Sequence, residues 1–116
     1  MKFGRLIAGS GLAIALTIVG VSKTAAQTAA AGDPVKGKEV FESSQPKCSL
    51  CHKIGDRGGK LGPDLSAVGT KRNAKWLTTF LPDPKLVDPT NKMPPVKATG
   101  KDLENLVAYL LSLKGK

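Results

Sequence analysis

Histidine, cysteine and methionine are scarce in this chain, and their scarcity limits the chemistry that it can perform. The 116 residues include one histidine, two cysteines and two methionines. A zinc site usually needs four ligands, so Cys48, Cys51 and His52 would leave its shell incomplete. A disulfide between cysteines two residues apart would close a tiny loop and stabilise little. Segments rich in strand formers are also missing, which disfavours a thioredoxin-like dithiol within a βαβ unit.

Aromatic residues are equally scarce, at 4% of the chain. Beyond residue 26 they are Phe41, Trp76, Phe80 and Tyr109. A domain of about 85–90 residues with so few large apolar side chains should be marginal without further support. The sequence also lacks the basic helix and the aromatic–basic platform that are typical of nucleic-acid binders, so we expect no nucleic-acid partner.

The N-terminal segment has the pattern of an export signal. Lys2 and Arg5 precede an uncharged run from Leu6 to Ser22, and small residues follow at 24–26 and 28–30. A positive region, an apolar run and a small-residue cleavage site, in that order, are typical of a secretory signal peptide. The alternative is an uncleaved membrane anchor, because the run is near the lower length limit for a span.

We therefore predict a signal peptide over 1–26, cleaved near 26–31, and one domain over 33–116. Removal of the signal peptide leaves 15 of the 18 basic residues against 9 acidic ones, a formal charge of +6. A basic exported protein is expected to meet an acidic patch on a protein partner, with electrostatic steering of the encounter. The prediction for localisation is the periplasm, with membrane association only if the N-terminal segment stays attached.

The motif most informative about chemistry is Cys48-Ser49-Leu50-Cys51-His52. Two thiols two residues apart, followed at once by histidine, are the attachment signature of c-type haem. Each thiol adds to one porphyrin vinyl group, and His52 can then bind the iron through a ring nitrogen. A buried porphyrin would also supply the apolar mass that the sequence lacks, so we expect the polypeptide without haem to be largely unfolded.

The second axial ligand follows by elimination. No other histidine exists, and Met93 is the only methionine besides Met1. A thioether opposite the histidine gives His/Met ligation, which raises the reduction potential of a haem. Alternatively, Met93 packs beside the haem without binding it, and the iron is five-coordinate or takes a lysine or water. The carbonyl of Pro63 can accept a hydrogen bond from the other ring nitrogen of His52 and fix its orientation.

One helix is predicted before this motif and one after it. Asp33-Pro34 indicates an N-cap and first helical position for a helix to about Glu42, whose Gly37 would permit close approach of another backbone near Tyr109 and Leu110. Asn73 is a candidate N-cap for a helix over 74–81.

The remaining signals lie near the C-terminus and in the loops. Thr99 and Asp102 resemble a capping box before a helix with an apolar stripe from Leu103 to Leu113. The glycine-rich stretch 55–62 and the proline-rich stretch 82–95 are predicted to lack regular structure.

Residues from about Asp33 to Lys114 resemble a class I c-type cytochrome of the small bacterial type, a monohaem cytochrome c. The resemblance is carried by Gly37/Val40/Phe41, the Cys48–His52 motif, Gly62-Pro63-Asp64-Leu65, Trp76-Leu77, Asn91-Lys92-Met93-Pro94-Pro95 and the Leu106–Leu113 helix with Tyr109. It implies an all-α fold in which N- and C-terminal helices cross and a short middle helix and loops wrap round one covalent haem c.

The resemblance also implies site residues. Cys48 and Cys51 would form the thioethers, His52 and Met93 the axial ligands, and Pro63 the acceptor for His52. Arg72 and Trp76 are candidates for packing against the haem or contacting a propionate.

The expected function is that of a monomeric periplasmic electron carrier, not an enzyme. It would shuttle single electrons between respiratory redox partners with acidic docking surfaces, such as an oxidase, reductase or dehydrogenase. Lys47, Lys53 and Lys92 are the candidate steering charges. The alternatives are a haem subunit of a larger oxidoreductase complex, or a ligand-binding or peroxidatic haem protein in which Met93 dissociates.

Overall fold

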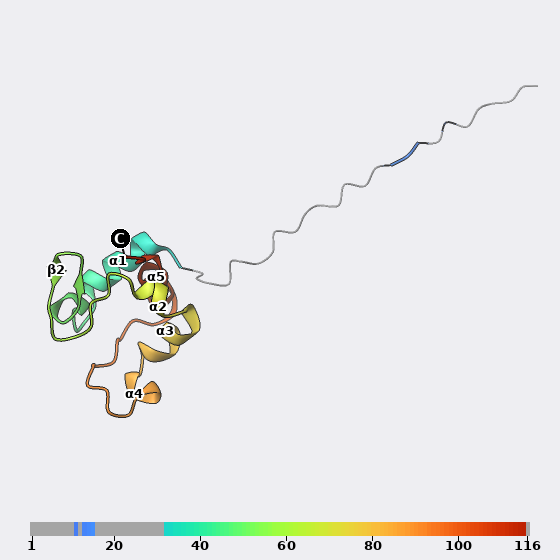
Figure 1. Cartoon of the computed structure of the whole chain (residues 1–116). Helices are drawn as coiled ribbons and strands as arrows, with labels where there is room; N and C mark the ends of the chain where they lie inside the picture. The colour runs from blue at the N-terminus through green and yellow to red at the C-terminus, as the bar shows by residue number, and fades with distance from the viewer. Residues whose placement is uncertain (1–10, 12, 16–31, 116) are drawn as a thin grey trace, which may run out of the picture.

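The computed structural model describes residues 11, 13–15 and 32–115, and from residue 32 onward it is mostly helical (Figure 1). The elements are α1 (Pro34–Ser43), the 3-10 helix η2 (Cys48–Leu50), β1 (Lys53–Ile54), β2 (Arg57–Gly58), α2 (Val68–Lys71), α3 (Ala74–Phe80), α4 (Pro84–Val87) and α5 (Gly100–Ser112). Most of the predicted signal peptide lies outside the described residues, so that prediction stays open. None of the helices in the described part of the chain has the length and apolar character that crossing a bilayer requires.

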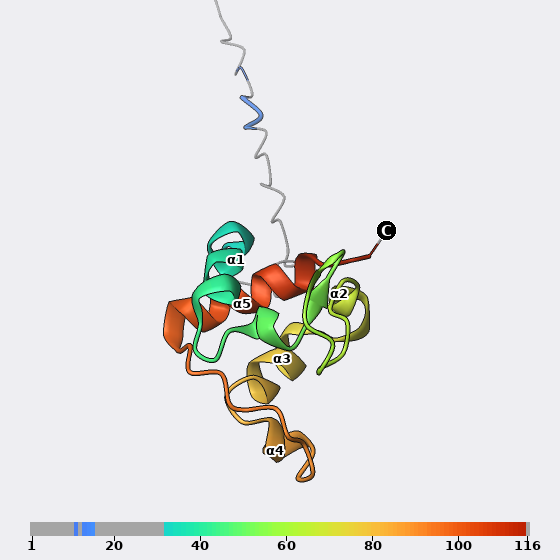
Figure 2. The same cartoon turned by 90° about the vertical axis from the view of Figure 1, so that its left-hand side faces the viewer.

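The first and last helices cross, as predicted (Figure 2). Asp33 caps α1, its Oδ1 accepting hydrogen bonds from the backbone N–H of Val35 at 2.8 Å and of Lys36 at 3.4 Å. Gly37 is buried at the crossing, where an added Cβ would overlap the carbonyl of Asn105 and lie 2.7 Å from Cβ of Tyr109. The predicted close approach near Tyr109 is confirmed, and the carbonyl that faces Gly37 is that of Asn105, one turn earlier in α5.

The core lies where α5 meets the other helices. Its buried apolar residues are Phe41, Val68, Leu77, Leu81, Val96, Leu106, Val107 and Leu110. The ring of Phe41 meets that of Tyr109 edge-on, with centroids 5.6 Å apart. The side chain of Asn105 is also buried, and its Oδ1 accepts a 2.8 Å hydrogen bond from the backbone N–H of Asp33. This bond ties the start of α1 to the middle of α5.

The middle helix α3 begins as predicted, because Asn73 Oδ1 accepts a 2.9 Å hydrogen bond from the backbone N–H of Trp76. The proline-rich stretch that follows is more ordered than predicted, since it contains α4. Asp83 caps this short helix by accepting from the N–H of Lys85, and Pro84 occupies its first turn. A local cap and a preorganised proline together explain the additional helix.

Two further details differ from prediction. Thr99 precedes α5 but its side chain makes no capping hydrogen bond, and Gly100 has a φ of +55°, so the predicted capping box does not form. The glycine-rich stretch contains β2, which pairs with β1 immediately before the stretch in a two-stranded antiparallel ribbon, with Lys53 opposite Gly58. Gly55 turns this ribbon with a φ of +61°, a conformation that glycine adopts without steric cost.

Candidate functional site

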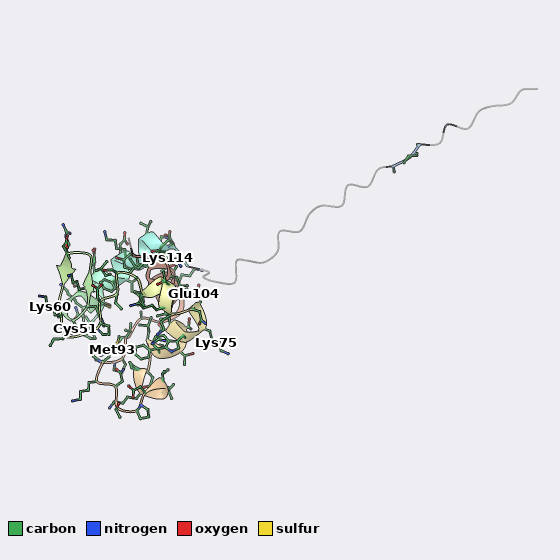
Figure 3. The ribbon with its side chains drawn as sticks, viewed as in Figure 1. Cys51, Lys60, Lys75, Met93, Glu104 and Lys114 are labelled. Atoms are coloured by element: carbon green, nitrogen blue, oxygen red, sulfur yellow. The ribbon has the colours of Figure 1, made fainter. Side chains whose placement is uncertain are left out.

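A cavity of about 760 Å³ is lined by residues from most of the described elements. The residues with sulfur or imidazole groups in this lining are Cys48, Cys51, His52 and Met93. Figure 3 shows Cys51 and Met93 on the same side of the molecule, with Lys75 on the other side. The fold therefore brings together two thiols, an imidazole and a thioether that are spread over more than forty residues of sequence.

His52 is held in one orientation. Its side chain is only 9% exposed, and its Nδ1 lies 2.8 Å from the carbonyl oxygen of Pro63. A carbonyl oxygen only accepts, so Nδ1 carries a proton, and in the neutral ring Nε2 is then the nitrogen with the free lone pair. Gly62 packs against the ring, because a Cβ added there would lie 2.5 Å from Cε1 of His52. The loop that bears Pro63 thus presents the imidazole with a nitrogen available to a metal.

The two cysteines lie at the ends of the η2 turn. Both are free thiols and half-buried, and Sγ of Cys48 is 3.3 Å from Oγ of Ser44. Burial raises the pKa of the Cys48 thiol above its ordinary value, and the hydrogen bond with Ser44 partly offsets this effect. Before any covalent attachment, the Cys48 thiol therefore loses its proton less readily than the thiol of a free cysteine.

Met93 lies half-buried in the loop between α4 and α5. Its backbone N–H donates a 2.9 Å hydrogen bond to Oδ1 of Asn91. Asn91 and Pro94 line the same cavity. The sequence predicted Met93 as an iron ligand but indicated no role for Asn91. An asparagine two residues before the expected ligand is the signal for such a turn, because asparagine side chains bind backbone two residues onward.

An aromatic wall completes the cavity. The guanidinium carbon of Arg72 lies 4.2 Å from the centroid of the Trp76 ring, which stacks on Phe80 with centroids 4.4 Å apart and an interplanar angle of 15°. All three residues line the cavity. The structure therefore places the predicted Arg72 and Trp76 together, and adds Phe80, which the sequence did not indicate as a site residue.

The lining fits a porphyrin better than a simple metal site. The cavity volume is within the usual range for cofactor pockets, and much of its wall is apolar. Apolar walls come from α2, α3 and α5, through Val68, Leu77, Phe80, Leu81, Leu106 and Leu110. Within the described ranges, no three His, Cys, Asp or Glu side chains gather as ligands for a metal ion. Two thiols and an imidazole beside a large apolar cavity are the donor set that haem c needs.

Comparison with known proteins gives consistent results. The family model described as Cytochrome c matches residues 34–114. Cytochrome c2 of Rhodomicrobium vannielii is 30% identical over an alignment that covers 90% of this chain and 98% of the relative. Cytochrome c-554 of Methylosinus trichosporium is 29% identical, with 79% of this chain and 83% of the relative covered.

Solved structures share the fold. SoxXA from P. pantotrophus matches with a TM-score of 0.63 at 21% identity, over 78% of this chain and 88% of that one. The c-type cytochrome SorU from Sinorhizobium meliloti matches with a TM-score of 0.56 at 25% identity, over 72% and 92%. Cytochrome c2 from Rhodobacter sphaeroides also gives 0.56, at 22% identity, over 73% and 98%.

Proposed function

Because the chain belongs to the cytochrome c family, we propose that it is an exported carrier of single electrons with His52 and Met93 as its axial haem ligands. The predicted class I fold is confirmed by the similar solved structures. The motif Cys48–His52 within the matched region provides for one covalent haem c. Bound haem c supplies one-electron exchange between the ferric and ferrous states of its iron.

The observation that carries the proposal is the hydrogen bond from His52 Nδ1 to the Pro63 carbonyl. It orients the ring, fixes the tautomer and leaves Nε2 for the iron. Cys48 and Cys51 would hold the porphyrin through thioethers, and the Met93 sulfur would take the remaining axial position. The wall formed by Arg72 and Trp76 would pack against the haem or meet a propionate.

With His52 and Met93 both bound to the iron, no coordination position would remain for a substrate. The apolar lining from Leu77, Leu106 and Leu110 would keep water away from the iron. These two features favour electron exchange over bond-making chemistry, so we propose a carrier and not an enzyme. The predicted signal peptide over 1–26 would place it in the periplasm, as a domain over 33–116.

The partners would be redox proteins with acidic docking surfaces. Lys47 precedes the thiol turn, Lys53 is in β1, and Lys92 lines the cavity beside Met93. Positive charges at these three positions would raise the rate of encounter with an acidic surface and suppress encounters with basic ones. We propose that the carrier acts as a monomer and exchanges electrons with an oxidase, reductase or dehydrogenase.

The test is the near-infrared spectrum of the ferric holoprotein. We expect a Met–iron charge-transfer band in the wild type and its loss in Met93→Leu, with mass spectrometry showing one covalent haem in both. Lys97→Leu, an exposed change in the same loop, serves as the control and should keep the band. A wild type without the band, or with a high-spin spectrum, would reject His52/Met93 ligation and favour the ligand-binding alternative.

A further inference from the structure

The loop that carries Met93 is fixed to the fold at two points. At one end, the backbone N–H of Asp88 donates to the carbonyl of Pro84 at 3.0 Å, which closes α4. At the other end, the N–H of Val96 donates to the carbonyl of Leu81 at 2.8 Å, and Val96 is buried. The residues between these two points have to place the Met93 thioether.

Few backbone donors are available within this stretch. Pro94 and Pro95 have no N–H, so Lys92 and Met93 supply the only amide donors between Asn91 and Val96. The N–H of Met93 donates to Oδ1 of Asn91 at 2.9 Å. This hydrogen bond fixes the backbone immediately before the methionine, whereas the two prolines that follow it contribute no donor.

Asn91 is itself held in place. Its backbone N–H donates to the carbonyl of Asp88 at 2.9 Å. The Asp88 carboxylate in turn accepts hydrogen bonds from the backbone N–H of Thr90 at 2.9 Å and from its hydroxyl at 2.7 Å. Two consecutive side-chain turns, one at Asp88 and one at Asn91, thus link the end of α4 to Met93.

We propose that Asn91 is a positioning residue for the distal ligand, holding the Met93 backbone so that its sulfur stays directed at the iron. The inference rests on the proposed His52/Met93 ligation. Without the side-chain acceptor, the backbone of residues 92 and 93 gains conformational freedom, and states with the sulfur displaced become more populated. An added ligand that competes with Met93 binds through those states, so its apparent affinity reports their population.

Imidazole titration of the ferric holoprotein, followed through the Met–iron band, measures this population. In Asn91→Ala we expect the imidazole concentration at half-loss of the band to fall roughly fivefold, the effect of one ordinary hydrogen bond. Asn91→Ser keeps a shorter acceptor without adding charge, so its midpoint should lie between those of Asn91→Ala and the wild type.

The matched control is Asn73→Ala. It removes another asparagine Oδ1 that accepts a backbone hydrogen bond at 2.9 Å, but at the start of α3. Guanidinium unfolding should show loss of stability in both alanine variants, whereas the imidazole midpoint should fall only for Asn91→Ala. Equal midpoints for Asn91→Ala and wild type, or an equal fall in Asn73→Ala, would overturn the positioning role. A wild type that lacks the band altogether would instead overturn the proposed ligation.

Discussion

His52 Nδ1 lies 2.8 Å from the carbonyl oxygen of Pro63, and the residue before that proline, Gly62, packs directly against the same imidazole ring. The backbone of 62–63 thus acts on the histidine twice, once by hydrogen bonding and once by contact. The carbonyl selects the tautomer, and the absence of a side chain at 62 lets the loop approach closely enough to do so. The proline ring is not itself the acceptor.

This relationship predicts that substitutions at two neighbouring positions affect the reduction potential differently. Gly62→Ala places a methyl group 2.5 Å from Cε1 of His52, so the ring or the loop has to move. We expect a loss of about 1–3 kcal/mol in unfolding free energy and a changed reduction potential. Pro63→Ala keeps the carbonyl and should leave the potential near that of the wild type. Guanidinium unfolding and potentiometric titration check both, and equal shifts in potential would contradict the assignment.

The helix crossing is tested at Gly37. In an isolated helix, alanine is more favourable than glycine by about 1 kcal/mol. At this position the added methyl would overlap the Asn105 carbonyl, so Gly37→Ala should lower the unfolding free energy by about 1–3 kcal/mol despite its helix propensity. Lys38→Ala, an exposed change on the same helix, is the control and should have little effect. A stabilised Gly37→Ala would show that the helices do not approach this closely.

The proposed steering role of three lysines is tested with small redox probes of opposite charge. Replacing Lys47, Lys53 and Lys92 by glutamate should slow electron exchange with an anionic iron cyanide complex and speed exchange with a cationic ruthenium ammine. Both effects should shrink when ionic strength rises, because charges are screened within about 10 Å at 0.1 M salt. The same change of charge at Lys36, Lys38 and Lys101, on α1 and α5, is the control. If the control triple variant gives equal changes, net charge and not its location governs the rate.

The loop that carries Pro63 should respond to acid through Asp64. The hydroxyl of Ser66 donates to Asp64 Oδ1 at 2.6 Å and its N–H donates at 2.8 Å, and these bonds lower the pKa of that carboxyl. A carboxyl with a depressed folded-state pKa stabilises the fold above its unfolded-state pKa, and this contribution disappears as pH falls through the folded-state value.

Ser66→Ala should therefore raise the Asp64 pKa toward its ordinary range, which NMR titration of the side chain measures. The stability deficit of the variant should be largest at neutral pH and should shrink in acid. Thr90→Val makes the same comparison at Asp88, whose pKa is lowered by the corresponding bonds. An unchanged Asp64 pKa in Ser66→Ala would show that these hydrogen bonds do not act on the carboxyl.

The features that the sequence predicts correctly are those with local signals. Asp33-Pro34 and Asn73 predict helix starts because a cap satisfies donors within three residues of itself. The apolar stripe of α5 predicts its buried face for a similar reason, since helical periodicity is a local property. The Cys48–His52 motif and the scarcity of histidine and methionine predicted the candidate ligands, all of which line one cavity.

The remaining features depend on contacts between distant residues or on competing local signals. The hydrogen bond between Asn105 and Asp33 joins residues 72 positions apart, so no pattern near either one predicts it. Thr99 and Asp102 suggest a capping box, but Thr99 makes no side-chain cap and Gly100 between them has a left-handed φ of +55°. The proposed role of Asn91 depends on a loop whose ends are fixed by α4 and by the hydrogen bond from Val96 to the Leu81 carbonyl, neither of which the sequence indicated.

The central claim is that protein side chains occupy both axial positions in both oxidation states. The most direct measurement is the visible spectrum of the reduced holoprotein before and after addition of carbon monoxide at neutral pH. A carrier with His52 and Met93 bound should give an unchanged six-coordinate ferrous spectrum. Rapid appearance of a carbon monoxide complex would contradict the account, because it would show an open coordination position and support the ligand-binding alternative.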